Sequence, residues 1–105
     1  MKHLTNKQKY DLIKEACYDT IHDKPYYQMI GIQNFGLLHD IADALGMLGN
    51  YGSNLRNLSH RINNIMRSLI KDGYPIKEYR IKCCSWREKE TWHPCFEIKE
   101  DINNA

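Results

Sequence analysis

The stretch that decides the fold is SNLRNLSHRINNIMRSLIKDGYPI, residues 53–76. Its apolar residues recur at steps of one, three, four and seven, which places them in a single stripe along a helix. Ser53 or Asn54 can cap the start of this helix, and Gly73 ends it. The pattern predicts an amphipathic helix over residues 53–72. Its apolar stripe consists of Leu55, Leu58, Ile62, Ile65, Met66, Leu69 and Ile70.

The opposite face of this helix is polar and cationic. No aspartate or glutamate occurs between residues 53 and 71, so arginines and asparagines face solvent without carboxylates among them. A face of this kind is suited to an anionic partner. The predicted outer face consists of Arg56, Asn57, His60, Arg61, Asn63, Asn64, Arg67 and Lys71.

The period of the pattern changes from 3.6 to 2 after Gly73. This alternation predicts a two-stranded hairpin over residues 77–99 with a polar tip at residues 87–91. Pro94 lacks a backbone N–H, which favours an edge position for the second strand. Residues 100–105 are expected to be a frayed tail. The expected cross-strand pairs are Ile81–Ile98, Cys84–Cys95 and Trp86–His93.

The N-terminal segment carries the signature of a helix start. Thr5 and Gln8 have the spacing of a capping box, and apolar residues follow at helical intervals. A proline at position 25 stops a helix and restricts the residue before it. We therefore expect a first helix over residues 5–22.

A second helix is expected over residues 35–46. Asn34 can cap its start, and Gly46 can supply a left-handed stop. The preceding segment, residues 26–34, fits either a short strand or one loose turn. Together these elements predict an α+β fold, three helices followed by a C-terminal hairpin, in a single domain spanning residues 1–105.

Composition excludes several classes of protein. No stretch approaches the roughly 18 apolar residues of a membrane span, and no apolar run follows the first lysine as in a signal peptide. We therefore expect a cytoplasmic protein that does not enter a membrane. The net charge is +2, but residues 53–91 contain nine Lys/Arg and four Asp/Glu, an excess of five positive charges. The basic residues thus gather on the helix and hairpin described first.

The sequence offers little for catalysis or metal binding. Its four cysteines include no C-x-x-C pair, so buried or half-buried thiols are expected rather than a zinc site. His39 and Asp43 have i, i+4 spacing, but an exposed helix face explains them more simply. No histidine lies in a triad-like or H-E-x-x-H pattern. We expect no enzyme activity, no metal and no cofactor.

Two segments resemble the winged helix-turn-helix superfamily. LHDIADALG, residues 38–46, is similar to the first helix of a helix-turn-helix, and INNIMRSLIKDGYPI, residues 62–76, resembles the end of a recognition helix and the entry to a wing. The resemblance implies a three-helix domain with a β-hairpin wing that binds double-stranded DNA as a transcription regulator. Because one such domain offers little contact area, a homodimer would be expected.

The resemblance also implies roles for particular side chains. Helix 53–72 would enter the major groove, where asparagines can bond adenine edges and arginines can bond guanine edges or phosphates. Cations at the helix end and on the wing would contact phosphates. These wing-side cations are Lys71, Arg80, Lys82, Arg87 and Lys89.

A different class of function stays open. Trp86 and Trp92 lie near the tip of the predicted hairpin, and tryptophans at an exposed tip suit a protein interface. The alternative is a phage or mobile-element accessory protein that uses the same fold to bind a host protein.

Overall fold

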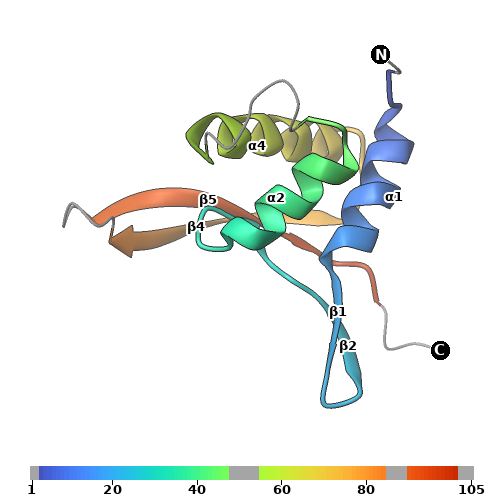
Figure 1. The fold of residues 1–105 in the computed structure, drawn as a ribbon, viewed down its shortest axis with the longest axis horizontal. Helices are drawn as coiled ribbons and strands as arrows, with labels where there is room; N and C mark the ends of the chain where they lie inside the picture. The colour runs from blue at the N-terminus through green and yellow to red at the C-terminus, as the bar shows by residue number, and fades with distance from the viewer. Residues whose placement is uncertain (1–2, 48–54, 85–89, 102–105) are drawn as a thin grey trace.

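The computed structural model describes residues 3–47, 55–84 and 90–101 (Figure 1). Within these ranges the chain has three helices and five strands, and every strand pair is antiparallel. The α+β class predicted from the sequence is confirmed. The elements are α1 (Asn6–Cys17), β1 (Tyr18–Ile21), β2 (Lys24–Tyr27), β3 (Ile30–Gly31), α2 (Phe35–Ala44), α4 (Leu55–Lys71), β4 (Ile76–Cys84) and β5 (Glu90–Ile98).

Helix α1 begins as predicted but ends five residues early. Thr5 and Gln8 form the capping box: the Thr5 hydroxyl accepts from the Gln8 backbone N–H at 3.2 Å, and the Gln8 side chain accepts from the Thr5 N–H at 2.9 Å. The helix stops at Cys17, so the predicted extension to residue 22 is wrong.

The residues after Cys17 form a hairpin instead, made by β1 and β2. Tyr18 pairs with Tyr27, and their rings meet edge to face at 6.2 Å. Only His22 and Asp23 lie between the strands, with φ of 52° and 62°. Positive φ at both central residues is the backbone of a type I′ turn, which suits the twist of a two-residue hairpin. In Figure 1 this hairpin projects away from the helices.

Strand β3 and helix α2 follow. The short strand predicted as one option within residues 26–34 exists, because Ile30 pairs with Phe96 on β5. The Asn34 side chain caps α2 by accepting from the Leu37 N–H at 3.2 Å, as expected. The predicted stop is also confirmed: Gly46 has a φ of +71°, just beyond the end of the helix, which reverses the chain there.

Helix α4 runs within the predicted range of residues 53–72, although residues 53–54 lie outside the described part of the chain. Its end is a Schellman motif, in which the Gly73 N–H donates to Ile70 at 3.0 Å and the Tyr74 N–H donates to Leu69 at 3.1 Å. Gly73 has a φ of +95°, a conformation that favours glycine. This turn directs the chain into β4.

The predicted register of the β4–β5 hairpin is wrong. Ile98 lies opposite Ile76 rather than Ile81, and Ile81 lies opposite His93. The observed register buries both Ile76 and Ile98, whereas Ile81 is only half-buried. The observed and predicted registers differ by an odd number of residues. Because side chains alternate between the two faces of a strand, this shift changes which residues of β4 and β5 share a face of the sheet.

Other details of the predicted hairpin change with the register. Cys84 lies opposite Glu90 and not Cys95, and His93 lies opposite Ile81. Trp86, the predicted partner of His93, lies outside the described part of the chain. Strand β5 is not an edge strand, because the sheet order is β3-β5-β4. Pro94 is nevertheless accommodated, since β3 pairs only with Cys95 and Phe96 and leaves that side of Pro94 unpaired.

The core lies where the three helices meet the sheet (Figure 1). Alternate residues of β4 and β5 face the helices, and α4 contributes the stripe read from the sequence. The buried apolar residues of this cluster are Tyr10, Ile13, Cys17, Ile30, Leu37, Leu38, Ile41, Ala42, Leu58, Ile62, Met66, Leu69, Ile76, Phe96 and Ile98.

The chain beyond β5 contacts α1 at Glu100, the second residue after the strand. The Tyr10 hydroxyl donates to Glu100 at 2.7 Å, and the Lys14 Nζ lies 3.2 Å from the same carboxylate. The hydrogen bond from Tyr10, together with those from Lys14, holds the pKa of Glu100 below its ordinary value. The expected frayed tail therefore does not begin at residue 100, and residues 102–105 lie outside the described part of the chain.

Candidate nucleic-acid interface

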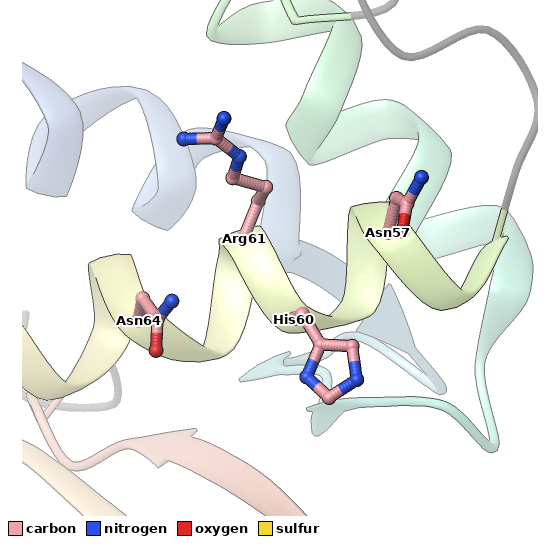
Figure 2. A pocket seen from close by; sticks show the side chains of 4 residues that line it. All are labelled: Asn57, His60, Arg61 and Asn64. Carbon is pink, nitrogen blue, oxygen red and sulfur yellow. The ribbon is translucent and has the colours of Figure 1, made fainter.

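The exposed side of α4 presents a shallow hollow without acidic groups. Asn57, His60, Arg61 and Asn64 line it, at the i, i+3, i+4 and i+7 spacing of one helix face. Figure 2 shows the four side chains rising from α4, with the Arg61 guanidinium and the His60 imidazole pointing to opposite sides in this view. Arg56, on the preceding turn, is exposed as well. The predicted polar face exists at these five positions.

The chemistry of this face is that of hydrogen-bond donors. A guanidinium carries five N–H groups, each amide carries two together with one acceptor, and imidazole adds another donor. None of the 17 residues of α4 is acidic, so no carboxylate on the helix itself opposes an anion. These donors and acceptors can form hydrogen bonds with the phosphates and base edges of nucleic acids.

Asn63 departs from the prediction, because its side chain is buried with 7% of its surface exposed. The prediction that it lies on the outer face is wrong. It lies one helical turn before Arg67, which bonds Glu78 on β4, and so on the flank of α4 toward that strand. Its Oδ1 accepts no hydrogen bond from any described residue. Asn63 is therefore not part of the exposed face that could contact a partner.

The Arg67 guanidinium already forms an ion pair within the protein. Its Nε and one terminal nitrogen each lie 3.3 Å from an oxygen of Glu78 on β4, a two-point ion pair. This pair links α4 to the sheet and offsets the charge of Arg67, although 46% of its side chain stays exposed. Lys71, at the C-terminal end of α4, is exposed and interacts favourably with the helix dipole.

The β4–β5 hairpin extends this basic surface. Arg80 and Lys82 are exposed, and Trp92 is 60% exposed. Lys82 lies opposite Trp92, with its Nζ 6.0 Å from the centre of the indole. The other predicted hairpin residues, Trp86, Arg87 and Lys89, lie outside the described part of the chain.

The sequence did not predict two exposed apolar side chains on the β1–β2 hairpin. Tyr18 is 51% exposed and Ile21 49% exposed. The available signal was the pair His22-Asp23 between β-forming residues, since both residue types tolerate positive φ. The regular spacing that continues from α1 to Ile21 concealed it.

Two cysteines lie in the core, and the described residues include no candidate metal site. Cys17 and Cys95 are buried free cysteines, as expected for thiols in a core. Burial raises the pKa of Cys17 to about 12, so it stays protonated at neutral pH. Among residues 3–47, 55–84 and 90–101, no group of three or more His, Cys, Asp or Glu side chains could hold a metal ion. In the same ranges, no helix is both long and apolar enough to cross a bilayer.

Comparison with known proteins identifies no relative of this chain. No family model matches the sequence, and no curated protein or solved structure matches it.

Proposed function

We propose that this chain is a winged-helix DNA-binding protein of the transcription-regulator type. In this proposal α4 enters the major groove, and the β4–β5 hairpin is the wing. The observation that carries the proposal is the exposed face of α4, where Arg56, Asn57, His60, Arg61 and Asn64 gather on a helix without a single acidic residue.

The order of the elements supports the same proposal. A helix, a short strand, two further helices and a hairpin follow one another, and β3 joins the sheet beside β5. A winged helix has this order, with its recognition helix directly before the wing. The inserted β1–β2 hairpin projects away from α4 (Figure 1) and leaves the α4 face accessible.

The proposed roles follow from the exposure of these side chains on α4 and on the hairpin. Arg56 and Arg61 are the best candidates for phosphate or guanine contacts, and Asn57 and Asn64 for adenine edges. Arg67 contributes less because Glu78 already binds it. Lys71, Arg80 and Lys82 would contact phosphates, and a homodimer would double the contact surface.

A salt-titrated binding assay on duplex DNA tests this proposal. The logarithm of the affinity should fall linearly with the logarithm of the salt concentration, with a slope of about 0.9 for each phosphate contacted. Arg56→Ala and Arg61→Ala should each weaken binding and reduce the slope by about 0.9 if the side chain bonds one phosphate.

Lys24→Ala provides the matched control, since it removes the same charge from the exposed β1–β2 hairpin. Its affinity and slope should equal those of the parent. A parent protein that does not bind duplex DNA would contradict the proposal, as would arginine variants that behave like the Lys24 variant.

A second candidate function is binding of a host protein. The exposed Tyr18 and Ile21 on the projecting β1–β2 hairpin favour it, because exposed aromatic and aliphatic side chains are frequent anchors of protein interfaces. Binding through this hairpin would survive substitution of the α4 arginines.

A further inference from the structure

The outer half of the β4–β5 hairpin carries a cationic and aromatic surface. Glu78 bonds Arg67 on α4, and Phe96, directly opposite Glu78, is buried in the core, so both face the helices. Strand alternation puts every second residue on this same face. Toward the tip, these residues are Arg80 opposite Pro94 and Lys82 opposite Trp92.

The neighbours of Trp92 indicate the kind of partner that would cover it. The indole is 60% exposed, and Lys82 lies within cation–π distance of it. Arg80 is exposed one step along the same face, and neither cross-strand pair contains a carboxylate. A protein hot spot usually lies in a well-packed pocket ringed by contacts that exclude water, whereas Trp92 is 60% exposed. An aromatic plane flanked by cations is instead the surface on which nucleic-acid strands stack their bases while their phosphates are neutralised.

We infer that the Arg80–Lys82–Trp92 surface binds an unpaired nucleotide, so that the preferred ligand is duplex DNA that adjoins a single-stranded segment. Inside a duplex the base planes are covered by their neighbours and only the base edges are accessible. Trp92 offers a plane rather than a hydrogen-bonding edge, so it requires an exposed base. This inference rests on the proposed function, in which α4 holds the adjacent duplex.

The test compares a blunt duplex with the same duplex carrying a single-stranded overhang. Trp86→Phe serves as the background in every measurement, since it leaves Trp92 as the one tryptophan of the two in the sequence. The overhang DNA should bind about tenfold more tightly than the blunt duplex and should quench the Trp92 fluorescence. Trp92→Ala should abolish this preference without changing the affinity for the blunt duplex.

Two further variants test whether the aromatic ring at position 92 causes the preference for the overhang. Trp92→Phe should retain part of the preference, because a phenyl ring still stacks on a base. Tyr18→Ala removes an aromatic side chain of similar exposure from the β1–β2 hairpin and should keep the full preference.

The outcomes separate this inference from the proposed function. Tight, salt-dependent binding of both DNAs without a preference for the overhang would overturn the inference alone. The same holds if Trp92→Ala weakens both DNAs equally, or if neither DNA quenches Trp92, which would leave that surface to a protein partner. Absence of binding to either DNA would overturn the proposed function together with the inference.

Discussion

At the scale of single residues, Asn63 is the described side chain least matched to its surroundings. Its carbonyl oxygen is buried without a donor among the described residues, while its neighbour Asn64 lies in the exposed hollow. A buried polar atom without a hydrogen bond costs about 1–3 kcal/mol. Two adjacent asparagines on one helix therefore differ in what they contribute to stability and to binding.

Replacing Asn63 by leucine, which is nearly the same size, should raise the free energy of unfolding by about 1 kcal/mol. The measurement is urea denaturation of the variant beside Asn64→Leu, whose exposed position should change stability by less than about 0.5 kcal/mol. A loss of stability in Asn63→Leu would mean that the Asn63 amide makes hydrogen bonds that hold α4 in place.

The candidate site could largely be predicted at this scale. The 3.6-residue period places Asn57, His60, Arg61 and Asn64 on the outer face of the helix, and the structure has them there. Asn63 was misplaced because the period shows which residues lie opposite the stripe but not which flank a later hairpin covers. The Arg67–Glu78 pair had no sequence signal for the same reason, since it joins separate elements.

At the scale of elements, β3 attaches the helical half of the chain to the hairpin. Two pairs join it to β5, and one of them sets Gly31 opposite Cys95. A Cβ atom at Gly31 would lie 2.9 Å from the Cβ of Cys95 and would also collide with the Gln33 side chain. The close approach of β3 to β5 therefore requires glycine at this position.

Gly31→Ala should lower the free energy of unfolding by roughly 1–3 kcal/mol, the cost of forcing an extra methyl group into a packed site. Gly36→Ala is the matched control: it lies within α2 with nothing closer than 4.0 Å to the new atom. That variant should gain up to about 1 kcal/mol from helix propensity. Thermal unfolding of both proteins measures the difference, and equal stabilities would contradict the close approach of β3 to β5.

Element types were more predictable than their limits and pairings. The caps at Thr5, Asn34 and Gly46 are local interactions, so the sequence could identify them. The β4–β5 register depends instead on which apolar pair reaches the core, and several pairings satisfy the same alternation. The β1–β2 hairpin was concealed because the spacing of α1 continues to Ile21, while the backbone turns at His22 and Asp23.

At the scale of the whole molecule, the acid-free face of α4 and the exposed side chains of the β1–β2 hairpin lie in different places. The acid-free face of α4 carries cations, and Arg80 and Lys82 extend them onto the outer hairpin. Exposed Tyr18 and Ile21 lie on the β1–β2 hairpin, which projects away from α4 (Figure 1). The described residues thus present two separate surfaces on which a partner could act, and we propose that DNA binds the first.

The most direct test is to titrate isotope-labelled protein with a blunt DNA duplex and follow its amide resonances. We expect the largest shifts in α4, at Arg56, Asn57, His60, Arg61 and Asn64, and smaller shifts in β4 and β5 that disappear at high salt. Unchanged resonances throughout α4, or shifts confined to the β1–β2 hairpin, would contradict the proposal.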